Sequence, residues 1–164
     1  MTRQEMARAA ESLLLAAWFG GGIFLMFAAA PAAFRAAGSA TAAAGVVGAM
    51  LARWHYLALG APLILLMIEW RGRALAQTAR VVLLALALLA ASAQAGVDLK
   101  IHAIRAASPT PISDLAKTHP TRRSFGRLHG ISMALLTLQV LLAGAVVATG
   151  QASVRREIDR PSMS

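Results

Sequence analysis

Four long apolar stretches dominate the chain, and charged residues stand mostly at the ends of these stretches. A helix needs about 20 mostly apolar residues to cross about 30 Å of hydrocarbon. The backbone polar groups of such a segment must pair internally, which a helix achieves within a single stretch of chain. The pattern therefore predicts an all-α integral membrane four-helix bundle, with one membrane domain over residues 1–164. The predicted spans are about 10–34, 42–70, 79–104 and 124–150.

The second span has two possible starts, because Arg53 is the one charged residue between positions 36 and 68. Either one long tilted helix covers the whole stretch, or a shorter span begins near Arg53. Pro62 lies inside this span, where it removes a backbone hydrogen bond and is expected to kink the helix.

Composition supports a membrane protein. Apolar residues make up 58% of the chain and charged residues 14%, about half the usual charged share of a soluble domain. A soluble fold of this size would lack the polar surface to cover so much apolar mass. The net charge of +9 comes from basic residues that flank the apolar runs without forming a stripe. This distribution favours anchoring at a membrane surface over nucleic-acid binding.

The topology follows from the number of spans and from the basic residues between them. Four spans place both termini on the same side of the membrane. Eight arginines fall on that side: Arg3, Arg8, Arg71, Arg73, Arg80, Arg155, Arg156 and Arg160. Because basic residues concentrate in cytoplasmic segments, this distribution predicts that both termini are cytoplasmic.

Ionisable residues gather toward the side of the membrane that carries the first and third loops. Asp98, His102 and Arg105 are spaced by four and three residues, so they share one face of the third helix. Arg127 and His129 begin the fourth helix, which a short loop joins to the third. A polar contact between these two helices is therefore predicted from Asp98, Arg105, Arg127 and His129. As a buried ion pair it would lock the helices together.

The same residues allow other chemistries. His55, His102 and His129 could supply imidazole ligands, with Asp98 as a carboxylate, to copper, zinc or iron. Two histidines on facing helices could instead ligate haem. Asp98 and His102 could exchange protons in a proton or solute path. A further reading places the histidines at the membrane interface, beside Trp54.

Motifs for enzymatic chemistry are missing from the sequence. The absence of cysteine excludes disulfides, thiolate metal sites and cysteine nucleophiles. Ser132 lies three residues from His129, but neither a nucleophile elbow nor a suitable acid accompanies the pair. The sequence therefore favours a protein without enzymatic activity.

Small residues recur at four-residue spacing, which in lipid lets helices approach closely. The pairs are Gly126 with Gly130, Gly45 with Ala49, and Gly48 with Ala52. The run 20–22 consists of glycine and gives the first helix a notch for a neighbour. All of these positions are expected to pack the helices of one chain against one another, with a contact face for a second copy of the chain as the alternative.

Two motifs resemble a known family. The first is Trp18-Phe19-Gly20-Gly21-Gly22-x-Phe24 followed by Ala30-Pro31-x-x-Phe34, and the second is Phe125-Gly126-Arg127-Leu128-His129-Gly130-Ile131-Ser132. Their order resembles that in small bacterial membrane proteins related to transmembrane protein 205, a four-span family of unknown function. The resemblance marks as characteristic Trp18, Gly21, Pro31, Phe34, Phe125, Arg127, Leu128, His129 and Ser132. It also places the chain in a bacterial inner membrane.

The leading hypothesis is a structural or partner-binding membrane component without a cofactor. Its partners would be the lipid bilayer and a second copy of the chain or another membrane protein. The first alternative is a metal- or haem-binding protein that uses His129 with His102 or His55. The second alternative is a transporter of protons or small solutes.

Overall fold

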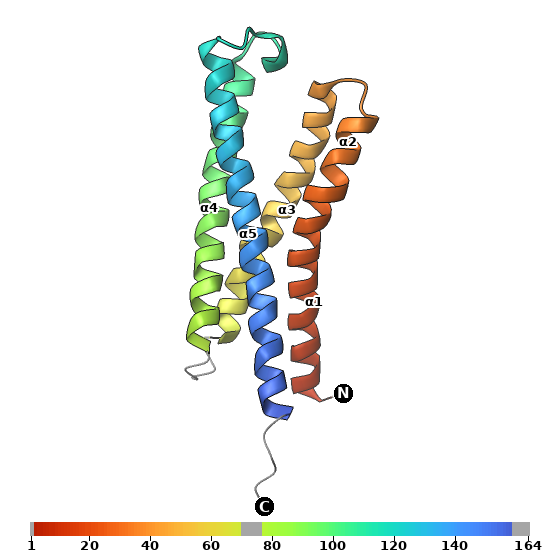
Figure 1. Cartoon of the computed structure of the whole chain (residues 1–164), viewed down its shortest axis with the longest axis vertical. Helices are drawn as coiled ribbons and strands as arrows, with labels where there is room; N and C mark the ends of the chain where they lie inside the picture. The colour runs from red at the N-terminus through yellow and green to blue at the C-terminus, as the bar shows by residue number, and fades with distance from the viewer. Residues whose placement is uncertain (1, 70–76, 159–164) are drawn as a thin grey trace, which may run out of the picture.

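The computed structural model describes residues 2–69 and 77–158, with side chains described for all of these except residues 3, 4, 77 and 151–158. All regular structure in these ranges is helical. In chain order the elements are α1 Arg3–Phe24, the π-helical turn η1 Leu25–Ala29, α2 Ala30–Ala36, α3 Ala40–Glu69, α4 Gln77–Ala107, the 3-10 turn η2 Ile112–Asp114 and α5 Pro120–Ile158 (Figure 1).

Four of the described segments are long and apolar enough to cross a membrane. They are Glu5–Ala36, Ala40–Glu69, Thr78–Ala107 and Pro120–Gly150. The first of these joins α1, η1 and α2 into one continuous rod. The predicted all-α chain with four potential spans is confirmed, and the four apolar helices suggest a multi-pass membrane protein.

Pro31 accounts for the irregular turn in the first span. Proline has no backbone N–H, so Pro31 cannot donate to the carbonyl of Phe27 as a regular α-helix requires. The chain widens into the π-helical turn Leu25–Ala29, in which the N–H of Ala30 donates to the carbonyl of Leu25. The widened turn keeps the rod continuous without the hydrogen bond that proline removes.

The second span is one long helix. Ser39 accepts a hydrogen bond from the backbone N–H of Ala42 at 3.1 Å, which caps α3 well before Arg53. His55 therefore lies in the middle of α3 rather than at its start, and Pro62 is accommodated inside the helix.

Trp54 is buried, so the expectation that it lies at the membrane interface is wrong. Its indole fills the notch that the glycines of α1 provide. A Cβ added to Gly21 would lie 3.6 Å from Trp54 Nε1, and one added to Gly22 would lie 3.3 Å from Trp54 Cζ2. The notch therefore receives a ring from α3.

The last helix begins four residues earlier than the predicted span. Its first residue is Pro120, whose missing N–H costs nothing at this position. His119 Nδ1 accepts a hydrogen bond from the N–H of Thr121 at 3.2 Å, which satisfies one exposed donor of the first turn.

The helices share one apolar core nearer to the end where α1 begins and α5 ends, here called the terminal end. Buried side chains at its centre include Trp18, Leu65, Leu84 and Val146. At the opposite end, which carries residues 37–39 and 108–119 and is here called the loop end, α2 and α3 stand apart from α4 and α5 (Figure 1). This separation positions the site described next.

Candidate binding site

A cleft of about 1010 Å³ opens between α3 on one side and α4 and α5 on the other. The segment 108–113 borders it at the loop end, and its walls are mostly apolar. Gly45, Gly48 and Gly126 line this cleft, and a Cβ added to any of them would meet none of the described atoms within 4 Å. These glycines leave space open instead of packing helices together.

The expectation that the four-residue small pairs pack the helices is therefore wrong for these glycines. Gly130 likewise has no described atom within 4 Å of an added Cβ. Close packing occurs instead at Gly22 and Gly144. An added Cβ would lie 2.7 Å from Val140 Cγ2 at the first position and 3.0 Å from the Phe19 ring at the second. Helix rotation, which spacing alone does not fix, decides which glycines face a neighbour.

Deep in the cleft, His55 of α3 faces Asp98 of α4. His55 Nε2 lies 3.7 Å from Asp98 Oδ2, and the two side chains are 13% and 21% exposed. Both residues line the cleft, where the carboxylate of Asp98 is partly exposed while His55 Nε2 itself is buried. The separation exceeds hydrogen-bond distance, which leaves a gap between two polar atoms.

Asp98 stands at the end of a chain of hydrogen bonds between α4 and α5. Ser132 Oγ donates to Asp98 Oδ1 at 2.7 Å, and Gln94 Nε2 donates to Ser132 Oγ at 3.3 Å. Gln139 Nε2 in turn donates to Gln94 Oε1 at 2.5 Å. Every donor in this chain points toward Asp98, an arrangement that stabilises a negatively charged carboxylate.

The tautomer of His55 follows from its other nitrogen. His55 Nδ1 lies 3.1 Å from the carbonyl oxygen of Leu51. A carbonyl only accepts, so Nδ1 carries the hydrogen of this bond. In the neutral ring Nε2 is then an acceptor, and none of the described residues donates to it. Two acceptors, Nε2 and Asp98 Oδ2, thus face each other across the gap.

Aromatic and basic side chains line the part of the cleft nearer to the loop end. The guanidinium carbon of Arg105 lies 5.0 Å from the centre of the Phe125 ring, which gives a cation–π contact. The ring of His129 stacks on Phe125 with 6.0 Å between centroids and 3° between planes. Arg122 donates to the carbonyls of Ser113 and Leu115, which holds the 108–119 segment against α5.

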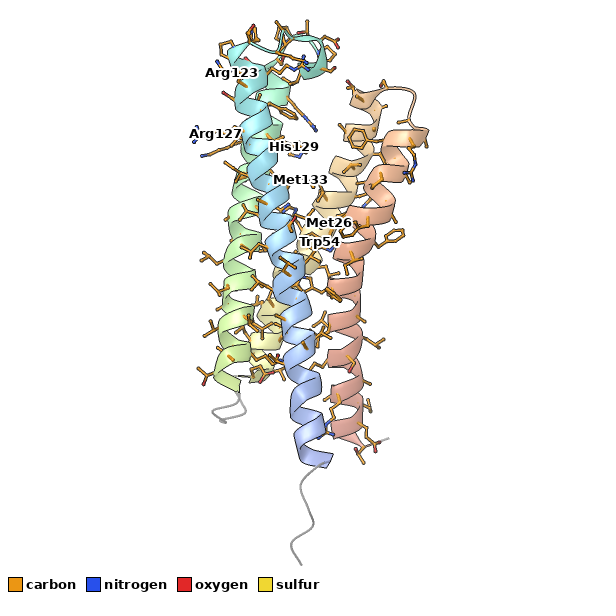
Figure 2. The ribbon with its side chains drawn as sticks, viewed as in Figure 1. Met26, Trp54, Arg123, Arg127, His129 and Met133 are labelled. Atoms are coloured by element: carbon orange, nitrogen blue, oxygen red, sulfur yellow. The ribbon has the colours of Figure 1, made fainter. Side chains whose placement is uncertain are left out.

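The four residues of the predicted contact between the third and fourth helices separate into different surroundings. Asp98 meets α5 through Ser132, while Arg105 and His129 both contact Phe125. Arg127 is exposed and points away from the cleft (Figure 2). The side chains of Arg105 and Arg127 make no salt bridge with Asp98 in the described part of the chain.

The three candidate metal ligands also differ in position. His55 stands beside Asp98, whereas His102 is exposed at the cleft wall and His129 stacks on its neighbouring ring. Among the described residues, no group of three or more histidine, cysteine, aspartate or glutamate side chains is close enough to hold a metal ion.

Sequence reasoning missed the two glutamines of the hydrogen-bond chain and a second charged cluster. Gln94 and Gln139 are fully buried. Gln94 lies four residues before Asp98 on the same helical face, a signal that the sequence did contain.

The second charged cluster lies near the terminal end. Arg80 of α4 forms ion pairs with Glu11 of α1 and with Glu69 of α3, the latter at 3.0 Å between Nε and Oε1. The exposed fractions of these side chains are 14% for Arg80, 24% for Glu11 and 8% for Glu69. The cluster joins three helices and closes this end.

Comparison with known proteins gives one family. The family described as "Domain of unknown function (DUF4149)" matches residues 13–110. The matched range contains the first motif, from Trp18 to Phe34, as well as His55 and Asp98, while the second motif lies beyond it. No curated protein and no solved structure matches the chain.

Proposed function

Because the chain belongs to the DUF4149 family of unknown function, we propose its activity from its site: a membrane-embedded binding protein that accepts an apolar molecule in the cleft. One observation carries the proposal. The apolar walls of a cleft of about 1010 Å³ lead to the partly exposed carboxylate of Asp98, beside which His55 Nε2 has no hydrogen-bond partner among the described residues. A ligand site combines an apolar body of this size with a few placed polar groups.

The cost of a carboxylate at this depth supports a functional role. Ionisable side chains within membrane spans are expensive and usually have a partner or a task. Ser132 satisfies one oxygen of Asp98, while the other faces His55 at 3.7 Å. Because the carboxylate is partly exposed to the cleft, a bound molecule can supply the donor that neutral His55 does not.

The leading hypothesis from the sequence, that the protein is a structural component of the membrane, is compatible with this proposal. The hydrogen bonds from Gln139 to Asp98 connect α4 with α5, and His55 brings α3 to the same point. We treat the chain of hydrogen bonds as the support that fixes Asp98 in place within a four-helix membrane bundle.

The proposed location is a bacterial inner membrane with both termini cytoplasmic. The start of α1 and the end of α5 lie at the same end of the molecule, as that topology requires (Figure 1). The narrower relation to proteins like transmembrane protein 205 is part of the proposal, carried by the motifs around Trp18 and His129.

Cysteine chemistry tests the cleft directly, because the chain has no cysteine of its own. In Gly48→Cys the new side chain lies on the cleft wall, where an added Cβ has open space. We expect N-ethylmaleimide to label this variant in lipid nanodiscs, and we expect decanol to slow the reaction by occupying the cleft.

Gly38→Cys is the matched control. Gly38 lies at the same end of the protein, is exposed, and is not part of the cleft lining. Decanol should leave its labelling rate unchanged. Equal slowing at both positions, or no slowing at position 48, would refute binding in the cleft.

Two alternative functions predicted from the sequence give different outcomes in simple experiments. A second copy or another membrane protein could place a helix in the cleft, in which case cross-linking from Gly48→Cys would yield a covalent complex. A haem or copper site on His129 with His102 or His55 would give a Soret band or stoichiometric metal in protein purified from its own membrane. The position of His129 on the Phe125 ring favours neither alternative over the binding of a small molecule.

Transport is the second candidate function. The cleft opens toward the loop end, while the core and the Arg80 cluster close the terminal end. A transporter in a conformation that is open to one side of the membrane has this form. Flux of a bound amphiphile across a liposome membrane, abolished when the cleft is filled by Gly48→Phe, would establish it.

A further inference from the structure

We infer that the charge of Asp98 is balanced either by a protonated His55 or by the ammonium group of an amphipathic amine in the cleft, so that binding of the amine releases a proton. This inference rests on the proposed function and names the class of ligand. Its carrying observation is the pair of acceptors, His55 Nε2 and Asp98 Oδ2, 3.7 Å apart at the cleft floor.

Two acceptors that face each other need a donor, which is either a proton between them or a group that reaches Asp98 from the cleft. The hydrogen bond to Leu51 holds the hydrogen of neutral His55 on Nδ1, so Nε2 presents a lone pair. Asp98 Oδ2 is an acceptor whenever the carboxylate is ionised. A proton on Nε2 turns the pair into an imidazolium–carboxylate ion pair, whereas an ammonium group in the cleft donates to the partly exposed carboxylate of Asp98.

The charge of the site favours a cation over a neutral donor. The donors of Ser132, Gln94 and Gln139 all point toward the carboxylate. With His55 neutral, Asp98 has no salt-bridge partner that is itself charged among the described residues. A negative charge in an apolar cleft is costly without a counter-charge.

Other charged and titratable groups face the cleft from the neighbouring elements. Those that line it are His102 and Arg105 of α4, His129 of α5 and Arg122 near the start of α5. Arg53 and Lys100 lie two residues from His55 and Asp98, respectively, but they are exposed and do not line the cleft. The basic groups lie toward the mouth, which favours a ligand whose far end is neutral or negative and disfavours small inorganic cations from water.

The size and walls of the cleft favour an organic cation. A metal ion would need further ligands beyond one imidazole and one carboxylate, and the described residues supply no group of three. A cleft of about 1010 Å³ with apolar walls instead fits an alkyl or aromatic body attached to the ammonium.

The exchange conserves charge. The amine arrives protonated, and its three N–H bonds stay intact. The imidazolium of His55 gives its Nε2 proton to water, and the ammonium takes the place of that proton beside Asp98. One positive charge enters the site and one leaves, so the charge buried in the cleft does not change.

Decylamine is the test ligand, with decanol and decanoate as matched neutral and anionic probes. Alkylamines of this kind stay protonated well above neutral pH, as lysine does with its pKa of about 10.4. We expect calorimetry on the whole protein in detergent to show decylamine binding that tightens as the pH rises. The gain is limited to about tenfold per pH unit, the value for release of one proton.

Variants separate the two members of the pair. Asp98→Asn removes the charge and should abolish preference for decylamine over decanol. His55→Gln removes the exchangeable proton, so decylamine should still bind but with its pH dependence lost. His102→Gln and His129→Gln are the controls, and each should keep the pH dependence of the unmodified protein.

Proton release gives an independent readout. In weakly buffered solution, an indicator dye should report protons released when decylamine binds and none when decanol binds. Binding of decylamine without released protons, or unchanged in Asp98→Asn, would overturn the inference. Tight binding of decanol or decanoate together with loss of amine preference would overturn it while the proposed cleft function stands. If none of the three probes binds, the proposed function itself is wrong.

Discussion

The two ends of the protein hold polar clusters of opposite kind. At the terminal end Arg80 stands between Glu11 and Glu69, and each carboxylate contacts the guanidinium. At the loop end Asp98 and His55 face each other across a gap inside a cleft. Both clusters contain partly buried ionisable groups, so burial of charge does not distinguish them. The distinguishing feature is that the terminal cluster pairs a permanent cation with its carboxylates at short range, 3.0 Å for Glu69, whereas His55 and Asp98 are 3.7 Å apart beside an open cleft.

The apolar core explains why the ends differ. The side chains of Leu65, Leu84 and Val146 fill the space between the helices on the side of His55 and Asp98 that faces the terminal end. On the loop side, small residues such as Gly45 and Gly48 leave the corresponding space open. The same four helices are therefore closed at one end and open at the other because of side-chain volume.

Removing the cation at the terminal end should have the largest effect on stability. Arg80→Ala leaves Glu11 and Glu69 without a counter-charge, and breaking such a buried pair typically costs about 3–5 kcal/mol. We expect a large decrease in the free energy of unfolding in detergent. Adding Glu11→Gln and Glu69→Gln to the same variant should restore much of the loss. No loss in Arg80→Ala would show that the cluster does not hold this end together.

Overpacking the interface between α1 and α5 should have the next largest effect. Gly22→Val places a Cβ against Val140, where the distance would be 2.7 Å, and overpacking of this kind costs about 1–3 kcal/mol. The matched change Gly48→Val, in open space on the cleft wall, should leave the melting temperature nearly unchanged. Equal destabilisation by both changes would contradict the contrast between a packed and an open region.

Removing the carboxylate of Asp98 should destabilise the protein less than these two changes. Asp98→Ala removes the acceptor for Ser132 and leaves a buried hydroxyl unsatisfied, which costs about 1–3 kcal/mol. Asp98→Asn retains an oxygen acceptor and should cost less. Thermal unfolding in detergent measures both, and an unchanged melting temperature for Asp98→Ala would show that the hydrogen-bond chain adds nothing to stability.

The smallest effect is expected at Arg127. This side chain is exposed and directed away from the cleft, and surface substitutions of this kind usually change stability by under about 0.5 kcal/mol. Arg127→Ala should therefore leave both the melting temperature and decylamine binding unchanged. A clear loss of either would bring Arg127 back into the polar contact predicted from the sequence.

The sequence predicts the helices well because apolar length and charge-free stretches reflect a local physical requirement. It also places Asp98 on a polar face of the third helix, which the structure uses. It does not predict that Asp98 meets His55 and Ser132, because helix rotation and register come from packing across the whole protein. Glu11, Glu69 and Arg80 were missed for the same reason, since their contact joins positions that are far apart in the chain.

The glycines teach a related lesson. Four-residue spacing indicates that a helix can be approached closely, but it does not say that a neighbour is there. The side chains of Val140 and Trp54 fill the space beside Gly22, whereas Gly48 and Gly126 face open space. The glycine run of α1 therefore marks a packed interface, while the four-residue pairs of α3 and α5 mark open space.

A matched pair of cysteines on α4 tests the contrast between the two ends most directly. Ala95 lines the cleft, and Ala87, about two turns earlier on the same helix, lies in the buried core. In lipid nanodiscs, the rate of labelling by N-ethylmaleimide should be many times higher for Ala95→Cys than for Ala87→Cys, and decylamine should slow labelling at position 95. Equal rates at the two positions, unaffected by decylamine, would contradict a binding cleft at the loop end.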